Sequence, residues 1–258
     1  MSNALLAAWR IGYKSVALGL LTLVVVPTQA IVLVFSRGSA SMRVPPLFHR
    51  GMAGVLGLDI EVCGKPVGSA QAVFISNHLS YLDIAAIGGV VRACFVAKDE
   101  VRGWPVMGAL ASLQQTVFIS RNSRDARAAA GALSGALAAG HRLVLFPEGT
   151  TSDGSGVLPF KSSIFALLAD PALSQIPLQP VSLALLEVDG RAVDAGGDRD
   201  LYAYHGDMHL GPHLLAFMRV SGARLRLRFH PPLASLPGES RKQLAARARQ
   251  AVAQGIGA

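Results

Sequence analysis

Residues 72–90 read AVFISNHLSYLDIAAIGGV, and this stretch decides the fold. Its first part, Ala72–Ser76, is a short apolar run, which predicts a β-strand buried on both faces. Its last part, Leu82–Val90, is apolar and long enough for a helix. His78 and Asp83 fall where the strand gives way to the helix. A strand, a polar turn and a helix in succession are typical of one unit of an α/β fold.

The same alternation continues along the chain. Further apolar or alternating runs predict strands at Cys94–Ala97, Thr116–Ser120, Leu143–Phe146, Gln179–Leu185 and Arg224–Phe229. Between the strands, helical patterns occupy Pro105–Ser112, Arg124–Ala139 and Ser162–Ala169. Near-continuous Val, Ile, Leu and Phe in most of the strands indicates burial on both faces. We therefore expect an α/β fold with a mostly parallel central sheet flanked by helices.

The N-terminal part of the chain is a separate, strongly apolar segment. Ser15–Phe35 contains no charged residue, and a helix of that length is about 31 Å long, close to the thickness of a bilayer core. Pro27 interrupts it, which suits either a spanning helix or a hairpin in one leaflet. A cleaved signal peptide and a buried core helix are the alternatives. We expect a membrane-anchoring helix or hairpin over residues 1–40 and one further domain over residues 41–258.

Composition narrows the class of partner. Half of the residues (51%) are hydrophobic and only 16% are charged, while 24 Lys and Arg against 16 Asp and Glu give a net charge of +8. An excess of positive charge favours an anionic partner. The sequence contains no basic stripe with interleaved aromatic residues and no recognisable nucleic-acid-binding module, so no nucleic acid is expected. Positive charge combined with high hydrophobicity points to lipid.

The two cysteines predict no special chemistry. Cys63 and Cys94 are spaced as neither a disulfide framework nor a metal site. Cys94 lies in an apolar run, where burial would keep its thiol protonated and unreactive. We expect both thiols to be reduced.

His78 and Asp83 form the first candidate site. On one continuous helix, residues five positions apart point about 140° away from each other, so these two can meet only across a turn. With His78 on the turn and Asp83 in the first helical turn, the carboxylate would orient the imidazole, whose other nitrogen could then accept a proton. The structural alternative is a capping box, with Ser80 as the N-cap and Asp83 at N3. The residues alone favour neither interpretation.

A second polar turn follows the predicted strand at Leu143–Phe146. Glu148, Gly149 and Thr150 come directly after this strand. Sites in open α/β sheets lie beyond the carboxyl ends of the strands, so we expect this turn to lie beside His78. An ordinary strand-to-loop turn is the alternative.

Cations also follow strands. Arg121 follows the strand at Thr116–Ser120, Lys98 follows Cys94–Ala97, and Lys161 lies in the motif Pro-Phe-Lys-Ser-Ser. Converging cations suit an anionic group, and arginine can bind phosphate or carboxylate with two parallel hydrogen bonds. Each of the three could equally be an ordinary surface charge.

Four motifs in order along the chain resemble the glycerolipid acyltransferase family, which contains the lysophosphatidic acid acyltransferases. They are Asn77-His78-x-Ser80-x-x-Asp83, Phe118-Ile119-x-Arg121, Phe146-Pro147-Glu148-Gly149-Thr150 and Ile176-Pro177-x-x-Pro180-Val181. The resemblance covers roughly residues 40–235. A finer resemblance, to the bacterial lyso-ornithine lipid acyltransferase branch, rests on Ala97-Lys98-x-Glu100-Val101-x-x-Trp104-Pro105-Val106, Phe146–Gly154, Lys161-Ser162-Ser163, Gly206-Asp207-Met208 and Pro212-His213-Leu214.

This resemblance implies a complete set of roles. His78 would be the general base and Asp83 its orienting partner, and the acceptor lyso-lipid would be bound by Lys98, Arg121, Glu148, Gly149, Thr150 and Lys161. The acyl donor would be acyl-carrier protein or acyl-CoA, with no metal and no cofactor. The enzyme would act at the cytoplasmic face of the bacterial inner membrane. Ser120 replaces the aspartate that many phosphatidate-forming relatives carry before the arginine, which leaves lysophosphatidate and a lyso-aminolipid both open as acceptor.

Three other classes of function compete with this one. A metalloprotein is suggested by His205, His209 and His213, four apart, although Gly206 and Gly211-Pro212 argue against an unbroken helix there. A lysophospholipid hydrolase would use water as the acceptor, but the sequence has no Gly-x-Ser-x-Gly elbow. A non-catalytic lipid-binding protein would leave His78 and Asp83 without a chemical task.

Overall fold

The structure is a computed structural model that describes residues 3–36, 38–120, 125–167, 175–195, 198–234, 236 and 238–257. Within these residues the strands are β1 (Leu58–Cys63), β2 (Val73–Ser76), β3 (Cys94–Lys98), β4 (Val117–Ile119), β5 (Leu143–Leu145), β6 (Leu178–Val188), β7 (Arg191–Ala192) and β8 (Ala223–Phe229). They form one sheet in the order β1-β8-β6-β2-β5-β3-β4, with β7 paired to β6. The pairs that β6 makes with β8 and β7 are antiparallel, and the other pairs are parallel. The predicted mostly parallel sheet is confirmed.

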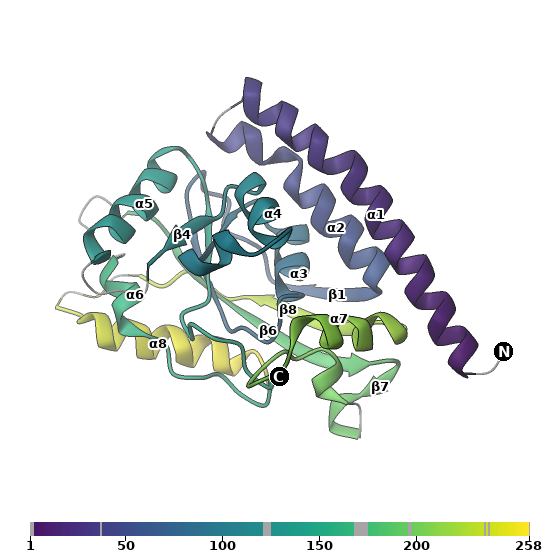
Figure 1. The fold of residues 1–258 in the computed structure, drawn as a ribbon. Coiled ribbons are helices and arrows are strands. Elements are labelled where there is room, and N and C mark those ends of the chain that lie inside the picture. The colour runs from purple at the N-terminus through teal and green to yellow at the C-terminus, as the bar shows by residue number, and fades with distance from the viewer. Residues whose placement is uncertain are drawn as a thin grey trace.

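Helices cover both faces of the sheet (Figure 1). They are α1 (Asn3–Phe35), α2 (Pro45–Leu56), α3 (Asp83–Val90), α4 (Met107–Leu113), α5 (Ala126–Ala138), α6 (Ser162–Leu167), α7 (Leu210–Arg219) and α8 (Arg241–Gln254). Phe74 packs into the core shared with α2, α3 and α7, whereas its neighbour Ile75 packs into the core shared with α5, α6 and α8. Successive strand residues point to opposite faces, so a strand covered on both faces is apolar throughout.

The six predicted strands are present, and none of their ends differs from the prediction by more than three residues. The predicted helices appear as α3 to α6, and the end of the helix predicted at Ser162–Ala169 lies outside the described residues. The strands β1 and β7 and the helices α2 and α7 were not predicted. The strand β1 lies at the edge of the sheet, where it pairs with β8, and Leu58 is the one buried residue among its six. Its sequence therefore lacks the continuous apolar run that identified the central strands.

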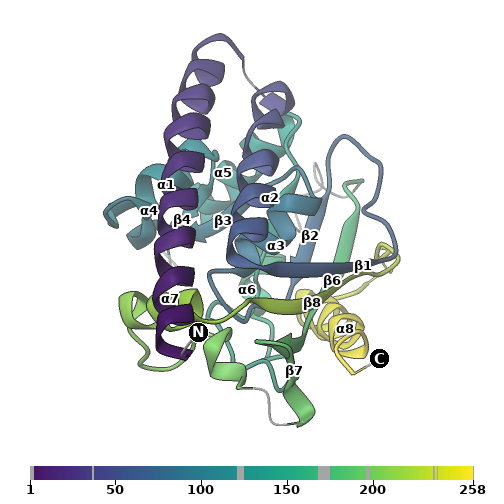
Figure 2. The same cartoon turned by 90° about the vertical axis from the view of Figure 1, so that its right-hand side faces the viewer.

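The N-terminal segment is a single helix rather than a hairpin, because α1 continues through Pro27. It is long and apolar enough to cross a membrane, with a mean hydropathy of 2.3 over its most apolar window. It lies beside α2 (Figure 2) and is tied to the domain by polar side chains. Lys14 donates to the carbonyls of Leu56 and Val220 at 3.0 and 2.9 Å, where α2 and α7 end. Gln29 donates to the carbonyl of Leu113, the last residue of α4, at 3.0 Å.

A close contact with α2 fixes the position of α3, the helix that begins at Asp83. A Cβ atom on Gly88 would lie 2.5 Å from the imidazole ring of His49, which is closer than real side chains approach. Glycine at this position therefore allows α3 to lie directly against α2. The tight packing holds the first turn of α3, and with it Asp83, in a fixed place relative to the sheet.

Candidate active site

The loop between β2 and α3 follows a central strand of the sheet, because β2 lies between β6 and β5. Strand β2 ends at Ser76, His78 lies on the loop, and Asp83 is the first residue of α3. Both neighbours of β2, the strands β5 and β6, run parallel to it. The carboxyl ends of β2 and β5 therefore meet at one edge, which is where binding sites form in sheets of this kind, while β6 continues past Val181, the partner of Ser76, to Val188.

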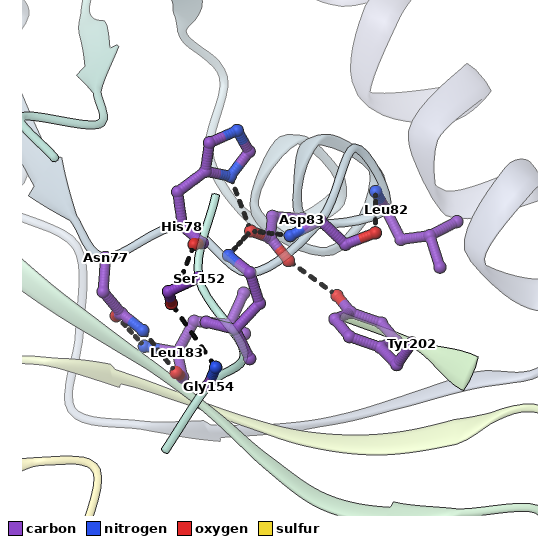
Figure 3. Close-up of polar contacts among 10 residues, drawn as sticks. Asn77, His78, Leu82, Asp83, Ser152, Gly154, Leu183 and Tyr202 are labelled. Atoms are coloured by element: carbon purple, nitrogen blue, oxygen red, sulfur yellow. Dashed lines mark hydrogen bonds and ion pairs between the residues drawn. The ribbon is translucent and has the colours of Figure 1, made fainter. Parts of the chain in front are cut away.

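His78 and Asp83 meet across this loop (Figure 3). Nδ1 of His78 lies 2.7 Å from Oδ2 of Asp83, and the Asp83 side chain is fully buried. The same Oδ2 accepts hydrogen bonds from the backbone N–H groups of Leu79 at 2.6 Å and Ser80 at 3.0 Å. The carboxylate thus both caps the start of the helix and contacts the imidazole, so the two interpretations that the sequence left open describe one arrangement. Because Asp83 accepts, Nδ1 carries the proton and Nε2 has a free lone pair.

The imidazole of His78 is held in one orientation. Its ring stacks on Phe146 with 3.9 Å between the centroids, and the backbone carbonyl of His78 accepts from the N–H of Ser152 at 2.9 Å. The other ring nitrogen points away from Asp83 in Figure 3. The side chain keeps 18% of its surface exposed, so the ring is reached from outside while its partner Asp83 is not.

Asn77 fixes the loop to the neighbouring strand. Its side-chain amide donates to the carbonyl of Leu183 and accepts from the N–H of the same residue, both at 2.8 Å. This pair satisfies two backbone groups of β6 at the point where the chain turns away from β2. Asn77, Phe146 and Ser152 were not among the predicted site residues, although all three fall inside the motifs that were recognised.

The second polar turn meets the first. Gly149 has a φ of +68°, a left-handed conformation that favours glycine, and its N–H donates to the carbonyl of Phe146 at 3.0 Å. The N–H of Lys161 donates to the carbonyl of Pro147 at 2.9 Å, and a Cβ atom on Gly149 would lie 2.6 Å from the ammonium of Lys161. The structure therefore brings Gly149 and Lys161 together, and the side chain of Thr150 is exposed beside them.

Glu148 lies underneath this turn rather than on its surface. Only 2% of the residue is exposed, and neither carboxyl oxygen has a well-formed hydrogen bond among the described residues. Burial raises the pKa of Glu148 to about 8 from its ordinary 4.5, while the backbone N–H groups of His78 and Leu158 oppose the rise. Its expected contact with the acceptor stays a prediction, and in this structure the carboxyl faces the backbone of the His78 loop.

The burial of Glu148 predicts that the free energy of unfolding depends on pH. The folded protein keeps the Glu148 proton up to about pH 8, whereas the unfolded chain loses it near 4.5, so the free energy of unfolding falls as the pH rises between these values. Glu148→Gln removes this titration. We expect the variant to be more stable than wild type at pH 8 by about 1–3 kcal/mol and to show a smaller difference at pH 4.5. Thermal unfolding of both proteins at the two pH values measures this, and an equal difference at both would contradict it.

The remaining predicted ligands are only partly placed. Lys98 ends β3, which pairs with β5, so it lies at the same edge of the sheet as the loops after β2 and β5. Arg121 lies outside the described residues. Lys98 is the last residue of β3 and Lys161 directly precedes α6, so the convergence of the three cations on one anionic group stays a prediction.

The histidines suggested as metal ligands, and the buried Cys94, have other surroundings. His205 pairs with Asp200 at 3.0 Å, whereas Nδ1 of His213 lies 3.0 Å from the hydroxyl of Tyr81. Within the described residues, no three His, Cys, Asp or Glu side chains are grouped as metal ligands. Burial raises the pKa of the Cys94 thiol to about 12, so this cysteine is not a nucleophile near neutral pH.

The comparisons with known proteins identify the class of protein in which a buried carboxylate and an oriented imidazole meet at the edge of this mostly parallel sheet. Residues 59–184 match the model of the acyltransferase family. The chain belongs to this family and is an acyltransferase.

Individual relatives agree. The chain is 36% identical to a lyso-ornithine lipid O-acyltransferase of Brucella abortus, over 87% of this chain and 85% of the relative, and 38% identical to one of Rhodobacter capsulatus, over 83% and 76%. It is 32% identical to a 1-acyl-sn-glycerol-3-phosphate acyltransferase of Neisseria meningitidis, over 70% and 68%. Its fold matches the crystal structure of the 1-acyl-sn-glycerophosphate acyltransferase of Thermotoga maritima, with a TM-score of 0.66 and 21% identity over 99% of this chain and 95% of that one. The family resemblance seen in the sequence is confirmed.

Proposed function

We propose that this acyltransferase moves a fatty acyl group from acyl-carrier protein or acyl-CoA to the free hydroxyl of lyso-ornithine lipid. The observation that carries the proposal is the 36–38% identity, over most of both chains, to relatives named for that acceptor. Relatives named for 1-acyl-sn-glycerol-3-phosphate match over shorter stretches, with 32% identity over 183 residues in one and 38% over 124 residues in another. The same chemistry would serve lysophosphatidate, which is therefore the second acceptor to test.

The arrangement of His78 and Asp83 supports direct transfer. As the lipid hydroxyl attacks the thioester carbonyl, its proton passes to Nε2 of His78 and a carbon–oxygen bond forms. When the tetrahedral intermediate collapses, the carbon–sulfur bond breaks and the thiolate takes the same proton from the imidazolium. Asp83, 2.7 Å from Nδ1, stabilises the imidazolium in between. A positioned base of this kind contributes about 10²–10⁴-fold to the rate.

The thioester is already an activated acyl donor, so the scheme needs no metal and no acyl-enzyme. The donor and the lipid ester both contain an acyl carbon, and only the atom bonded to it changes from sulfur to oxygen. We propose that Lys98, Arg121, Gly149, Thr150 and Lys161 bind the polar head of the acceptor at the same edge of the sheet. Lys161 and Gly149 are in contact there, which supports a shared site.

We also propose that α1 anchors the enzyme in one leaflet. Arg10, Lys14 and Gln29 of α1 donate to backbone carbonyls of the domain. Arg10 and Gln29 are 19 residues apart, about 28 Å along a helix, so the domain follows α1 for nearly the thickness of a bilayer core. A transverse α1 would carry α2 and α7 into the hydrocarbon, which favours a helix lying parallel to the surface.

The outward face of α1 is suited to lipid. Its exposed large side chains are apolar: Leu5, Trp9, Tyr13, Val16, Leu20, Leu23, Val24, Ile31, Val34 and Phe35. An apolar stripe of this length would cost considerable free energy in water and would be stabilised in the acyl region of a leaflet. Because both thioester donors are cytosolic, we assign the enzyme to the cytoplasmic face of the bacterial inner membrane.

An acceptor competition tests the proposed function. The purified full chain is reconstituted into vesicles with equal amounts of lyso-ornithine lipid and lysophosphatidate, and acyl-carrier protein or acyl-CoA carries the acyl group. We expect mass spectrometry to find the acylated ornithine lipid as the main product. Phosphatidate as the sole product would overturn the choice of acceptor, and free fatty acid alone would indicate a hydrolase.

Flotation of the same vesicles in a density gradient tests the proposed membrane anchor. We expect the protein to float with the vesicles, and protein left at the bottom of the gradient would contradict the anchor.

A further inference from the structure

Residues 199–204 lie beyond the matched family region and form hydrogen bonds with the active-site loops. The family model ends at residue 184, yet three contacts from residues 199–204 reach the site. Arg199 donates to the carbonyl of Gly154 at 3.0 Å, and the N–H of Tyr204 donates to the carbonyl of Leu79 at 2.8 Å. The hydroxyl of Tyr202 donates to Oδ1 of Asp83 at 2.8 Å (Figure 3). The last contact reaches the carboxylate itself.

The two oxygens of Asp83 have different surroundings. Oδ2 accepts from the His78 ring and from the N–H groups of Leu79 and Ser80. Among the hydrogen bonds of the described residues, Oδ1 accepts from Tyr202. Tyr202 is fully buried, and its ring packs edge-on against Phe217 of α7. The tyrosine is thus fixed by the core at one end and by the carboxylate at the other.

We propose that Tyr202 is a positioning residue for transfer: its hydroxyl holds Oδ1 of Asp83 so that Oδ2 faces His78, and it sets how strongly the carboxylate attracts the imidazolium. The inference rests on the proposed role of His78 and Asp83. Tyr202 touches neither substrate nor the reacting atoms, and it acts through Asp83.

The chemistry of a buried phenol suits this task. A carboxylate rotates about its bond to Cβ, and one donor on each oxygen fixes the plane that faces the imidazole. Burial and the charge of Asp83 both raise the pKa of Tyr202 well above its ordinary value, so the hydroxyl stays protonated and remains a donor. Because the donor is neutral, it moderates the charge on Asp83 without replacing the imidazolium as its counter-ion.

Tyr202→Phe tests the proposal, since it removes one oxygen and keeps the ring. We expect kcat to fall about 10- to 100-fold with the acceptor KM little changed, because a hydrogen bond to a charged group is lost. The less neutralised carboxylate attracts a proton on the imidazole more strongly. The acidic limb of the kcat/KM profile should therefore move to higher pH, by about half a unit. A wild-type kcat with an unmoved limb would overturn the proposal.

Two matched comparisons separate positioning from general packing. Tyr204→Phe makes the same chemical change two residues along and keeps the backbone N–H that bonds to Leu79. Its ring contacts Tyr81 and His213, and we expect a wild-type rate and pH limb. An equal loss in Tyr204→Phe would count against Tyr202. On an Asp83→Asn background, assayed at high enzyme concentration, Tyr202→Phe should have little further effect. A full additional loss there would show that Tyr202 does not act through Asp83.

A fluorinated tyrosine keeps the proposal testable if Tyr202→Phe unfolds. Replacing Tyr202 by 3-fluorotyrosine preserves the shape and makes the hydroxyl a stronger donor, so the acidic limb should move to lower pH, opposite to Tyr202→Phe. No movement would overturn the proposal. A failure of the proposed function looks different, because the wild-type chain would then transfer no acyl group to either acceptor.

Discussion

His78→Ala is expected to lower acyl transfer by about 10²–10⁴-fold, because it removes the imidazole that accepts the proton of the attacking hydroxyl. The fold should survive, since the loop is held by Asn77 and Ser152 through contacts that do not involve the imidazole. Turnover with saturating acyl donor and lyso-lipid measures the loss.

The control for this variant is another histidine. His205 pairs with the exposed Asp200, and His205→Ala removes a similar ring from that pair. We expect that variant to turn over at the wild-type rate. Substantial transfer by His78→Ala, within a few-fold of wild type, would end the general-base account.

Asp83→Asn should reduce kcat by about 10²–10⁴-fold while the protein stays folded. The N–H groups of Leu79 and Ser80 point at Oδ2, so they would hold the amide oxygen in the same position. The ring contact is then kept but the negative charge is lost, and the imidazolium is no longer stabilised. The acidic limb of the pH profile should move to lower pH.

Circular dichroism and thermal unfolding show whether Asp83→Asn is folded, and the pH profile of kcat/KM gives the limb. An unfolded variant would mean that Asp83 serves mainly as a helix cap. A folded variant with a wild-type rate would mean that the carboxylate has no part in transfer.

The fold was largely predictable because strands buried on both faces of a sheet are continuous apolar runs in the sequence. The neighbouring residues Phe74 and Ile75 of β2 face different cores, so both positions are apolar. The unpredicted helix α7 contains Gly211 and Pro212, which suggested a break. Pro212 lies in the first turn of α7, where a missing N–H costs nothing and a fixed φ is favourable.

The site could be predicted only for residues that lie close together in the sequence. His78 and Asp83 lie five residues apart, and the angle between helical positions showed that a turn had to separate them. Tyr202 lies 119 residues from Asp83, and nothing in its neighbourhood marks it as a partner of the dyad. Glu148 shows the opposite limit, because its place at a strand end suggested exposure and tertiary packing buried it.

Chemical rescue of His78→Ala by imidazole is the most direct measurement of the central claim. Free imidazole added to the variant should restore transfer in proportion to the concentration of its neutral form, so the rescued rate should rise with pH and level off once the added imidazole is deprotonated. A rescued rate that followed the protonated form, or a variant that needed no imidazole, would contradict a base at this position.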